Sequence, residues 1–253
     1  MFFSTLRAVE EYPIGAEVES LELSGFNGSI TWEPLDGGPA RVVAEKEVRG
    51  FGEDSLRAFL AELRIEEQSS AHQLVLRAVS PQRPFGVFAS QVRFVVFAPG
   101  EQIKHLRAKT SNGGIRLRAR TQGILHLTTK NGSITLAEAE GQVSLRTSNG
   151  RIEFGKLVLT GSSSLLTSNG RIEGQLELSG EGDHRIATSN GHISLRMPHG
   201  SQGSIRAATS NGKVEVLVGD TRATGRREVV IHGGEGPHLE ITTSNGSISV
   251  LGY

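Results

Sequence analysis

Apolar and polar residues alternate along most of the chain after residue 100, and Asn-Gly pairs interrupt this alternation at regular intervals. In the seven units that follow, the position four residues before each Asn is apolar and the position two residues before it is threonine. The position three residues after each Asn is Ile or Val. Because side chains of a strand point alternately to opposite faces, these positions all face one way. The pattern therefore predicts two short strands that meet at a corner in every unit.

The unit recurs about every 20 residues, most often as Thr-Ser-Asn-Gly, and self-similarity at a fixed period is the signature of a repeat architecture. We predict that its asparagines form a structural ladder of turns: Asn112, Asn131, Asn149, Asn169, Asn190, Asn211 and Asn245. The glycine after each Asn is expected to adopt the left-handed conformation, which has no steric cost for glycine. The last gap holds an insertion, roughly Val218 to Pro237, that is rich in Gly and Arg.

Two architectures could use such a unit. Asn-Gly between alternating strands is a strong hairpin signal, which would give an antiparallel meander. Alternatively, each unit is one coil of a parallel β-solenoid, with like corners stacked about 4.8 Å apart. The nearly constant Thr-Ser-Asn-Gly sequence at each corner favours the solenoid. In stacked corners, identical side chains can hydrogen-bond from one unit to the next, whereas a hairpin needs only Asn-Gly itself.

Residues 1 to about 100 follow a different pattern. One repeat-like piece lies at Leu21–Trp32, and strands are predicted at Arg41–Val48, Gln73–Val79 and Gln91–Phe97. Between them lies a predicted helix, Glu53–Leu63, because Leu56, Phe59, Leu60 and Leu63 fall on one helical face. We interpret residues 1–100 as an N-terminal β-rich cap with one short helix, continuous with a solenoid over residues 101–253. The ends of a solenoid need a cap because an open end exposes unpaired strand edges and core side chains. The C-terminal strand Ser247–Leu251 has no obvious cap.

A charged stripe follows the corners. Basic residues come directly after the glycine in four units, namely Arg151, Arg171, His192 and Lys213. Two residues further on, three of these units carry acids, namely Glu153, Glu173 and Glu215. In a stack these become neighbouring columns, either a binding stripe or, as we expect, an ion-pair network on a solvated face that contributes little to stability.

Composition and charge exclude several function classes. Lys plus Arg equals Asp plus Glu at 27 each, so no basic excess suggests a nucleic-acid partner. The absence of cysteine excludes disulfides, thiolate metal sites and cysteine nucleophiles. The histidines show no metal spacing, so no metal or cofactor is expected. No run is long and apolar enough to cross a bilayer, and no signal peptide is visible, so the chain as written predicts a cytoplasmic protein without direct membrane insertion.

Catalytic motifs are equally scarce. The serines of the corners lack a nucleophile elbow, and Gly233-Gly234-Glu235-Gly236 lacks the Lys-Ser/Thr of a phosphate loop. Only Glu153, Glu173 and Glu215 are aligned acids, and a glycosidase with paired carboxylates would have to use them. We therefore expect no enzyme.

The chain resembles the bacterial putative-adhesin family, a domain of unknown function. The resemblance spans roughly Glu17 to Val250 and rests on Leu21–Trp32, the helix, "QVRFVVFAPGEQIKHLRAKTSNGGIRL" and the reiterated "TSNGxI". It implies a right-handed parallel β-solenoid and an exported or envelope-associated setting, and it supplies no catalytic residues. The chain departs from many relatives because it shows no leader or membrane segment.

Three functions are compatible with the sequence. The first is a non-catalytic, adhesin-like binding or scaffold module whose sheet faces contact an unidentified protein or cell-surface polymer. The second is a homo-oligomeric scaffold that stacks end to end through the uncapped C-terminal strand. The third, and weakest, is a carbohydrate-active β-helix enzyme.

Overall fold

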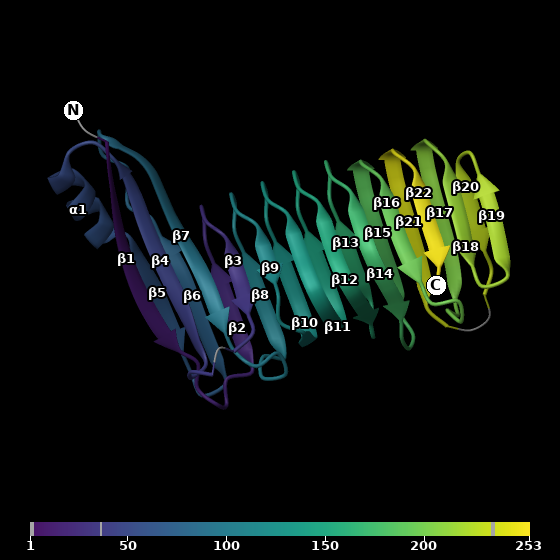
Figure 1. The fold of residues 1–253 in the computed structure, drawn as a ribbon, viewed down its shortest axis with the longest axis horizontal. Coiled ribbons are helices and arrows are strands. Elements are labelled where there is room, and N and C mark those ends of the chain that lie inside the picture. The colour runs from purple at the N-terminus through teal and green to yellow at the C-terminus, as the bar shows by residue number, and fades with distance from the viewer. Residues whose placement is uncertain (1–2, 36, 234–235) are drawn as a thin grey trace.

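The computed structural model describes residues 3–35, 37–233 and 236–253. Within these residues the protein is all-β, with 22 strands and a single helix. All strands belong to one continuous sheet that is mostly parallel and does not close on itself. The strands lie side by side along the long axis of the molecule (Figure 1).

The strands form two series that meet at the Asn-Gly corners. The strands that run toward the corners, together with the antiparallel strands paired beside them, form what we call the upstream face. The strands that leave the corners, together with their antiparallel neighbours, form the downstream face. In spatial order the upstream face consists of β5 (Arg64–Ser69), β6 (Gln73–Val79), β2 (Ser20–Ser24), β8 (His105–Lys109), β10 (Thr121–Thr128), the second half of β11 (Ile134–Arg146), β13 (Ser163–Leu166), β15 (Asp183–Asn190), β21 (His238–Asn245), β17 (Ser204–Asn211) and β20 (Glu228–Ile231).

The strands of the downstream face are given in the same spatial order, from the N-terminal end of the molecule. It consists of β1 (Ser4–Pro13), β4 (Arg41–Gly50), β7 (Val87–Phe97), β3 (Ile30–Glu33), β9 (Ile115–Leu117), the first half of β11, β12 (Ile152–Leu159), β14 (Ile172–Leu178), β16 (Ile193–Met197), β22 (Ile248–Gly252), β18 (Val214–Val218) and β19 (Thr221–Gly225). Alternate apolar residues of both faces enter one common core. Because the repeat strands pair in parallel, the antiparallel meander is excluded.

The N-terminal third contains the predicted elements. Strands β4, β6 and β7 cover the three predicted ranges, and the helix α1 (Glu53–Glu62) buries Leu56 and Phe59. Strands β2 and β3, from the repeat-like piece, pair directly with β8 and β9 of the repeat region. Two edge strands, β1 and β5, had no counterpart in the sequence prediction, because their polar residues hide the alternation that identifies an inner strand.

The C-terminal end differs from the expectation. The strands β21 and β22 do not end the sheet: β21 lies between β15 and β17, and β22 lies between β16 and β18. The predicted exposed C-terminal strand is therefore wrong, and Figure 1 shows the C-terminus set back from the end of the molecule. The insertion instead forms β19 and β20, which pair antiparallel with β18 and β17 and end the sheet.

Candidate functional site

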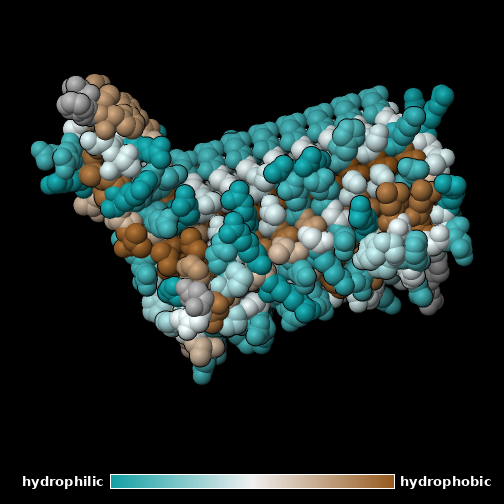
Figure 2. Space-filling view, viewed as in Figure 1, coloured by the Kyte–Doolittle hydropathy of each residue, from teal (hydrophilic) through white to brown (hydrophobic). Residues whose placement is uncertain are grey.

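The corners form a straight hydrophilic ridge along the strand ends (Figure 2). All eight asparagines of the chain stand in it, the seven named from the sequence and Asn27. Seven of the eight side-chain amides donate to the side-chain oxygen of a neighbouring asparagine at 2.7–2.9 Å, and the amide of Asn27 donates to the Ser90 carbonyl at 3.2 Å. The spatial order is Asn27, Asn112, Asn131, Asn149, Asn169, Asn190, Asn245 and Asn211.

The threonines and glycines of the corners complete this ladder. The threonines are buried, and each Oγ1 donates to the carbonyl of a corner glycine one unit away, as Thr147 does to Gly132 at 2.8 Å. The expected left-handed glycines are wrong, because among the corner glycines only Gly28 has a positive φ. Glycine is needed for close approach instead: a Cβ on Gly170 would lie 2.0 Å from the Gly150 carbonyl oxygen. Most polar side-chain groups of the ridge are therefore engaged in contacts between neighbouring corners.

The predicted charged stripe is interrupted. Because β22 enters between β16 and β18, Ser247 separates His192 from Lys213, and Ser194 and Ser249 separate Glu173 from Glu215. Three strand spacings, roughly 14 Å, divide Glu173 from Glu215.

The two acids that do adjoin are held by arginines. Arg171 bridges Glu153 and Glu173 at 3.0 Å each, and Arg151 approaches Glu153 at 2.9 Å. A glycosidase with paired carboxylates needs acid side chains that are free to contact the sugar, whereas both of these acids are engaged by arginine side chains.

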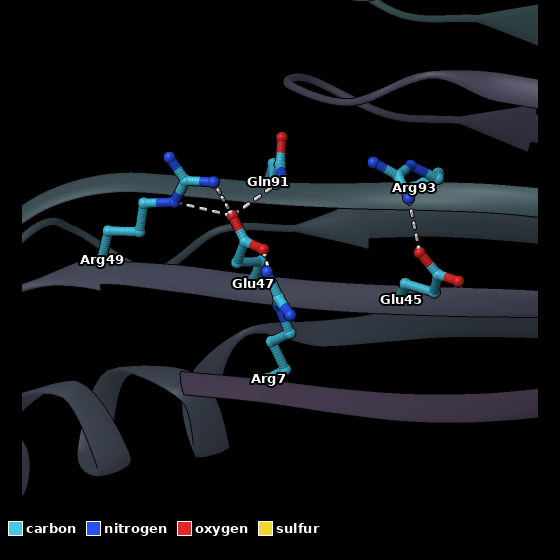
Figure 3. Close-up of polar contacts among 6 residues, drawn as sticks. All are labelled: Arg7, Glu45, Glu47, Arg49, Gln91 and Arg93. Atoms are coloured by element: carbon cyan, nitrogen blue, oxygen red, sulfur yellow. Dashed lines mark hydrogen bonds and ion pairs between the residues drawn. The ribbon is translucent and has the colours of Figure 1, made fainter. Parts of the chain in front are cut away.

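A second polar cluster joins β1, β4 and β7 (Figure 3). The Glu47 carboxylate, whose side chain is only 12% exposed, accepts hydrogen bonds from Arg7 at 2.8 Å, Arg49 at 2.7 Å and Gln91 at 3.0 Å. Burial by itself raises the pKa of Glu47, but the hydrogen bonds and charges of Arg7 and Arg49 outweigh it and place this pKa below its ordinary value. The cluster is a clamp between three antiparallel strands. Sequence reasoning missed it because its members come from three distant segments.

A basic groove lies on the upstream face. Two hollows of 390 and 550 Å³ adjoin there and share Glu22, Arg107 and His126 as lining residues. Strand pairing places a column of alternating cations and hydroxyls across β6, β2, β8, β10 and β11. In order, this column is Arg77, Ser24, Lys109, Thr128 and Arg146. We call these five residues, together with Arg107, the basic groove.

The cations of the basic groove are unlike most others in the protein. Within the described part of the chain, the side chains of Arg77, Arg107, Lys109 and Arg146 make no ion pair or hydrogen bond, whereas arginines of the downstream face such as Arg118 and Arg171 are paired with glutamates. Their alternation with buried residues is visible in the sequence. Their convergence is not, because β2 enters between β6 and β8 out of sequence order.

The described residues contain neither a metal-binding cluster nor a membrane-spanning helix. Over residues 3–35, 37–233 and 236–253, no three His, Asp or Glu side chains gather in a way that could hold a metal ion. No helix in the same ranges is long and apolar enough to cross a membrane.

Comparisons with known proteins give structural likenesses alone. No family model matches the chain, and no curated protein does. A putative adhesin from Bacteroides fragilis is similar at 10% identity over 97% of both chains, with a TM-score of 0.43. A putative cell adhesion protein from Clostridium sporogenes is similar at 9% identity over 98% of this chain and 100% of its own, with a TM-score of 0.36. A putative adhesin from Parabacteroides distasonis is similar at 10% identity over 97% of both chains, with a TM-score of 0.39. This level of similarity assigns no function to the chain.

Proposed function

We propose that the protein is a non-catalytic, adhesin-like binding module that holds an extended, negatively charged polymer in the basic groove. The observation that carries this proposal is the column of Arg77, Lys109 and Arg146, whose side chains make no ion pair within the described residues, on neighbouring parallel strands. The chain has no net charge, so the attraction is local to this face.

The spacing of the column defines the class of polymer. Two strand spacings, roughly 10 Å, separate each cation from the next, and a hydroxyl lies between them. Arginine pairs with carboxylate and sulfate groups through two parallel N–H donors. An acidic polysaccharide with a charged group on alternate sugars would present anions to the cations and hydroxyls to Ser24 and Thr128.

The carboxylates support a role without catalysis. The best-placed acids, Glu47, Glu153 and Glu173, are all engaged in ion pairs with arginines. A binding surface has no need of a free catalytic carboxyl group.

Titration with polymers of known charge tests the proposal. Polygalacturonate and dextran sulfate are expected to bind and neutral dextran is not, and the affinity should fall as salt rises. Arg107→Gln should weaken binding by roughly tenfold, the effect of losing one charge-assisted hydrogen bond. Arg196→Gln is the matched control, because Arg196 is an exposed arginine on the downstream strand β16 that makes no ion pair among the residues the structure describes. Equal binding of neutral dextran, or equal loss in the two variants, would refute the proposal, and a preference for nucleic acid over polysaccharide would replace it.

The handedness of the solenoid, its N-terminal cap and its cellular location complete the proposed function. We propose that residues 1–100 act as the cap of a right-handed solenoid and that the module works at the cell envelope, where acidic polymers are exposed. Detection of the protein in envelope fractions of its host would support this setting. Its recovery only from the cytosol would contradict it.

A further inference from the structure

Exposed aromatic residues gather at one tip of the molecule. Phe3 precedes β1, Phe51 follows β4, and Phe85 and Phe88 lie at the start of β7, so the strand register brings all four to one edge. The rings of Phe3, Phe51 and Phe88 pack with centroids 5.0–6.2 Å apart. We call these four residues the aromatic tip, and Figure 2 shows apolar surface at this corner of the protein.

The exposure of the aromatic tip is unusual for a surface. Phe85 is 102% exposed, Phe3 59% and Phe88 51%. A single exposed apolar side chain needs no explanation, but several in contact mark a surface that meets an apolar partner.

The turn that carries Phe85 is built to present it. The amide of Val87 donates to the Pro84 carbonyl at 3.3 Å, which places Phe85 and Gly86 at the centre of a β-turn. Gly86 has a φ of 97°, as the third position of a type II turn requires. The Gly86 carbonyl accepts the Phe51 amide at 2.8 Å, so the turn is anchored to β4. Phe85 is therefore held outward at the apex of a fixed turn.

The size and shape of the aromatic tip indicate which kind of partner can bind it. The exposed fractions of the three rings amount to about 400 Å² of apolar surface, about half of what each partner of a stable protein–protein complex contributes. Phe85 projects from the surface and does not line a groove. A projecting aromatic side chain can bury its ring among acyl chains without a shaped receptor.

We propose that the aromatic tip docks on the surface of a lipid bilayer, with Phe85 inserted and the long sheet directed away from the membrane. This peripheral contact revises the expectation of no membrane insertion without requiring a spanning segment. The charges beside the tip are mixed: Arg83 and Arg49 are basic, Asp54 is acidic, and Glu53 is paired with Arg57. Apolar insertion is therefore the main source of affinity, and neutral phosphatidylcholine should suffice.

Vesicle sedimentation tests this contact. The full chain is mixed with phosphatidylcholine vesicles, and in a second arm with vesicles that also contain phosphatidylglycerol. Wild type should sediment with both, and Phe85→Ser should lower the partition coefficient by about tenfold. Val230→Ser is the matched control, because Val230 is 45% exposed on β20 at the opposite end. Phe85→Trp should keep the affinity and shift its emission to shorter wavelengths with lipid, while Trp32 stays buried.

Four outcomes would overturn the proposal. The first is no binding to either vesicle, and the second is equal binding by wild type and Phe85→Ser. The third is a dimer in the absence of lipid that Phe85→Ser dissociates, because a second copy of the chain would then be the partner. Binding only to phosphatidylglycerol vesicles, lost in Arg107→Gln and retained in Phe85→Ser, would assign the contact to the basic groove instead.

Discussion

The asparagine ladder makes a prediction that depends on position within the stack. Asn169 lies in its middle: its amide donates to Asn149 at 2.8 Å, and its oxygen accepts from Asn190 at 2.9 Å. Asn211 lies at the end, where its amide donates to Asn245 at 2.9 Å and its oxygen has no partner among the described contacts. Replacement by alanine therefore removes two hydrogen bonds at Asn169 and one at Asn211.

The expected magnitudes follow from this difference. An average hydrogen bond contributes about 0.5–1.5 kcal/mol, and the lower half of that range applies here because the amides are exposed and can be rehydrated. Asn169→Ala should therefore lower the free energy of unfolding by about 1–2 kcal/mol, and Asn211→Ala by about half as much. Both variants keep the Cβ atom and the corner glycine, so the backbone of the corner is unchanged.

Urea unfolding followed by circular dichroism measures both losses under the same conditions. The ratio between the variants is more informative than either value, because errors of extrapolation affect both alike. Equal losses would mean that the corner side chains act only locally. No loss in Asn169→Ala would mean that water replaces the ladder without cost, and either result would refute the argument.

Three further predictions concern single residues. Gly170→Ala should lower the free energy of unfolding by more than about 4 kcal/mol, because the added Cβ would lie 2.0 Å from a carbonyl oxygen. Gly200→Ala is the control and should lower it little, because no atom lies within 4 Å of the added Cβ. Thermal unfolding compares the two variants. Glu47→Gln should lower the free energy of unfolding by about 1–2 kcal/mol at neutral pH. Because the pKa of Glu47 is lowered in the folded state, the difference between the variant and wild type should shrink as pH falls through the carboxyl range. A difference that does not change with pH would contradict the role of Glu47 in the clamp. Burial lowers the pKa of His184, whose ring nitrogens lack partners among the described residues, so the unfolded chain takes up the proton first and stability should fall below about pH 6.5. His184→Leu should remove this part of the pH dependence in urea titrations, and an unchanged slope would refute it.

The repeat itself was predictable because its physical requirements are local. Buried threonine two residues before Asn and buried Ile or Val three residues after it follow from strand alternation, and the structure has them in every unit. The helix Glu53–Glu62 was predictable in the same way, from the apolar stripe of Leu56 and Phe59.

The basic groove and the Glu47 clamp were not predictable, because both depend on the pairing of distant strands. Arg77 and Lys109 are brought to one column only because β2 pairs with both β6 and β8. Arg7, Glu47 and Gln91 meet only because β4 lies between β1 and β7. A single sequence shows which residues point outward and does not show which outward residues become neighbours.

The spatial order of the last repeat units was also not predictable from the sequence, and it explains how the sheet ends. Thr243 donates to the Gly191 carbonyl and Thr209 donates to the Gly246 carbonyl, as the threonines of the other corners do, so a unit can stack on one that is not its neighbour in sequence. The repeat therefore stabilises the stack without specifying its order, and the connections must decide it. Here the insertion forms β19 and β20, antiparallel to their neighbours, and the following strands β21 and β22 lie one position inward from β17 and β18. Because the terminal strands carry no Asn-Gly corner, they offer no matching edge to another parallel unit, which argues against end-to-end assembly through this end.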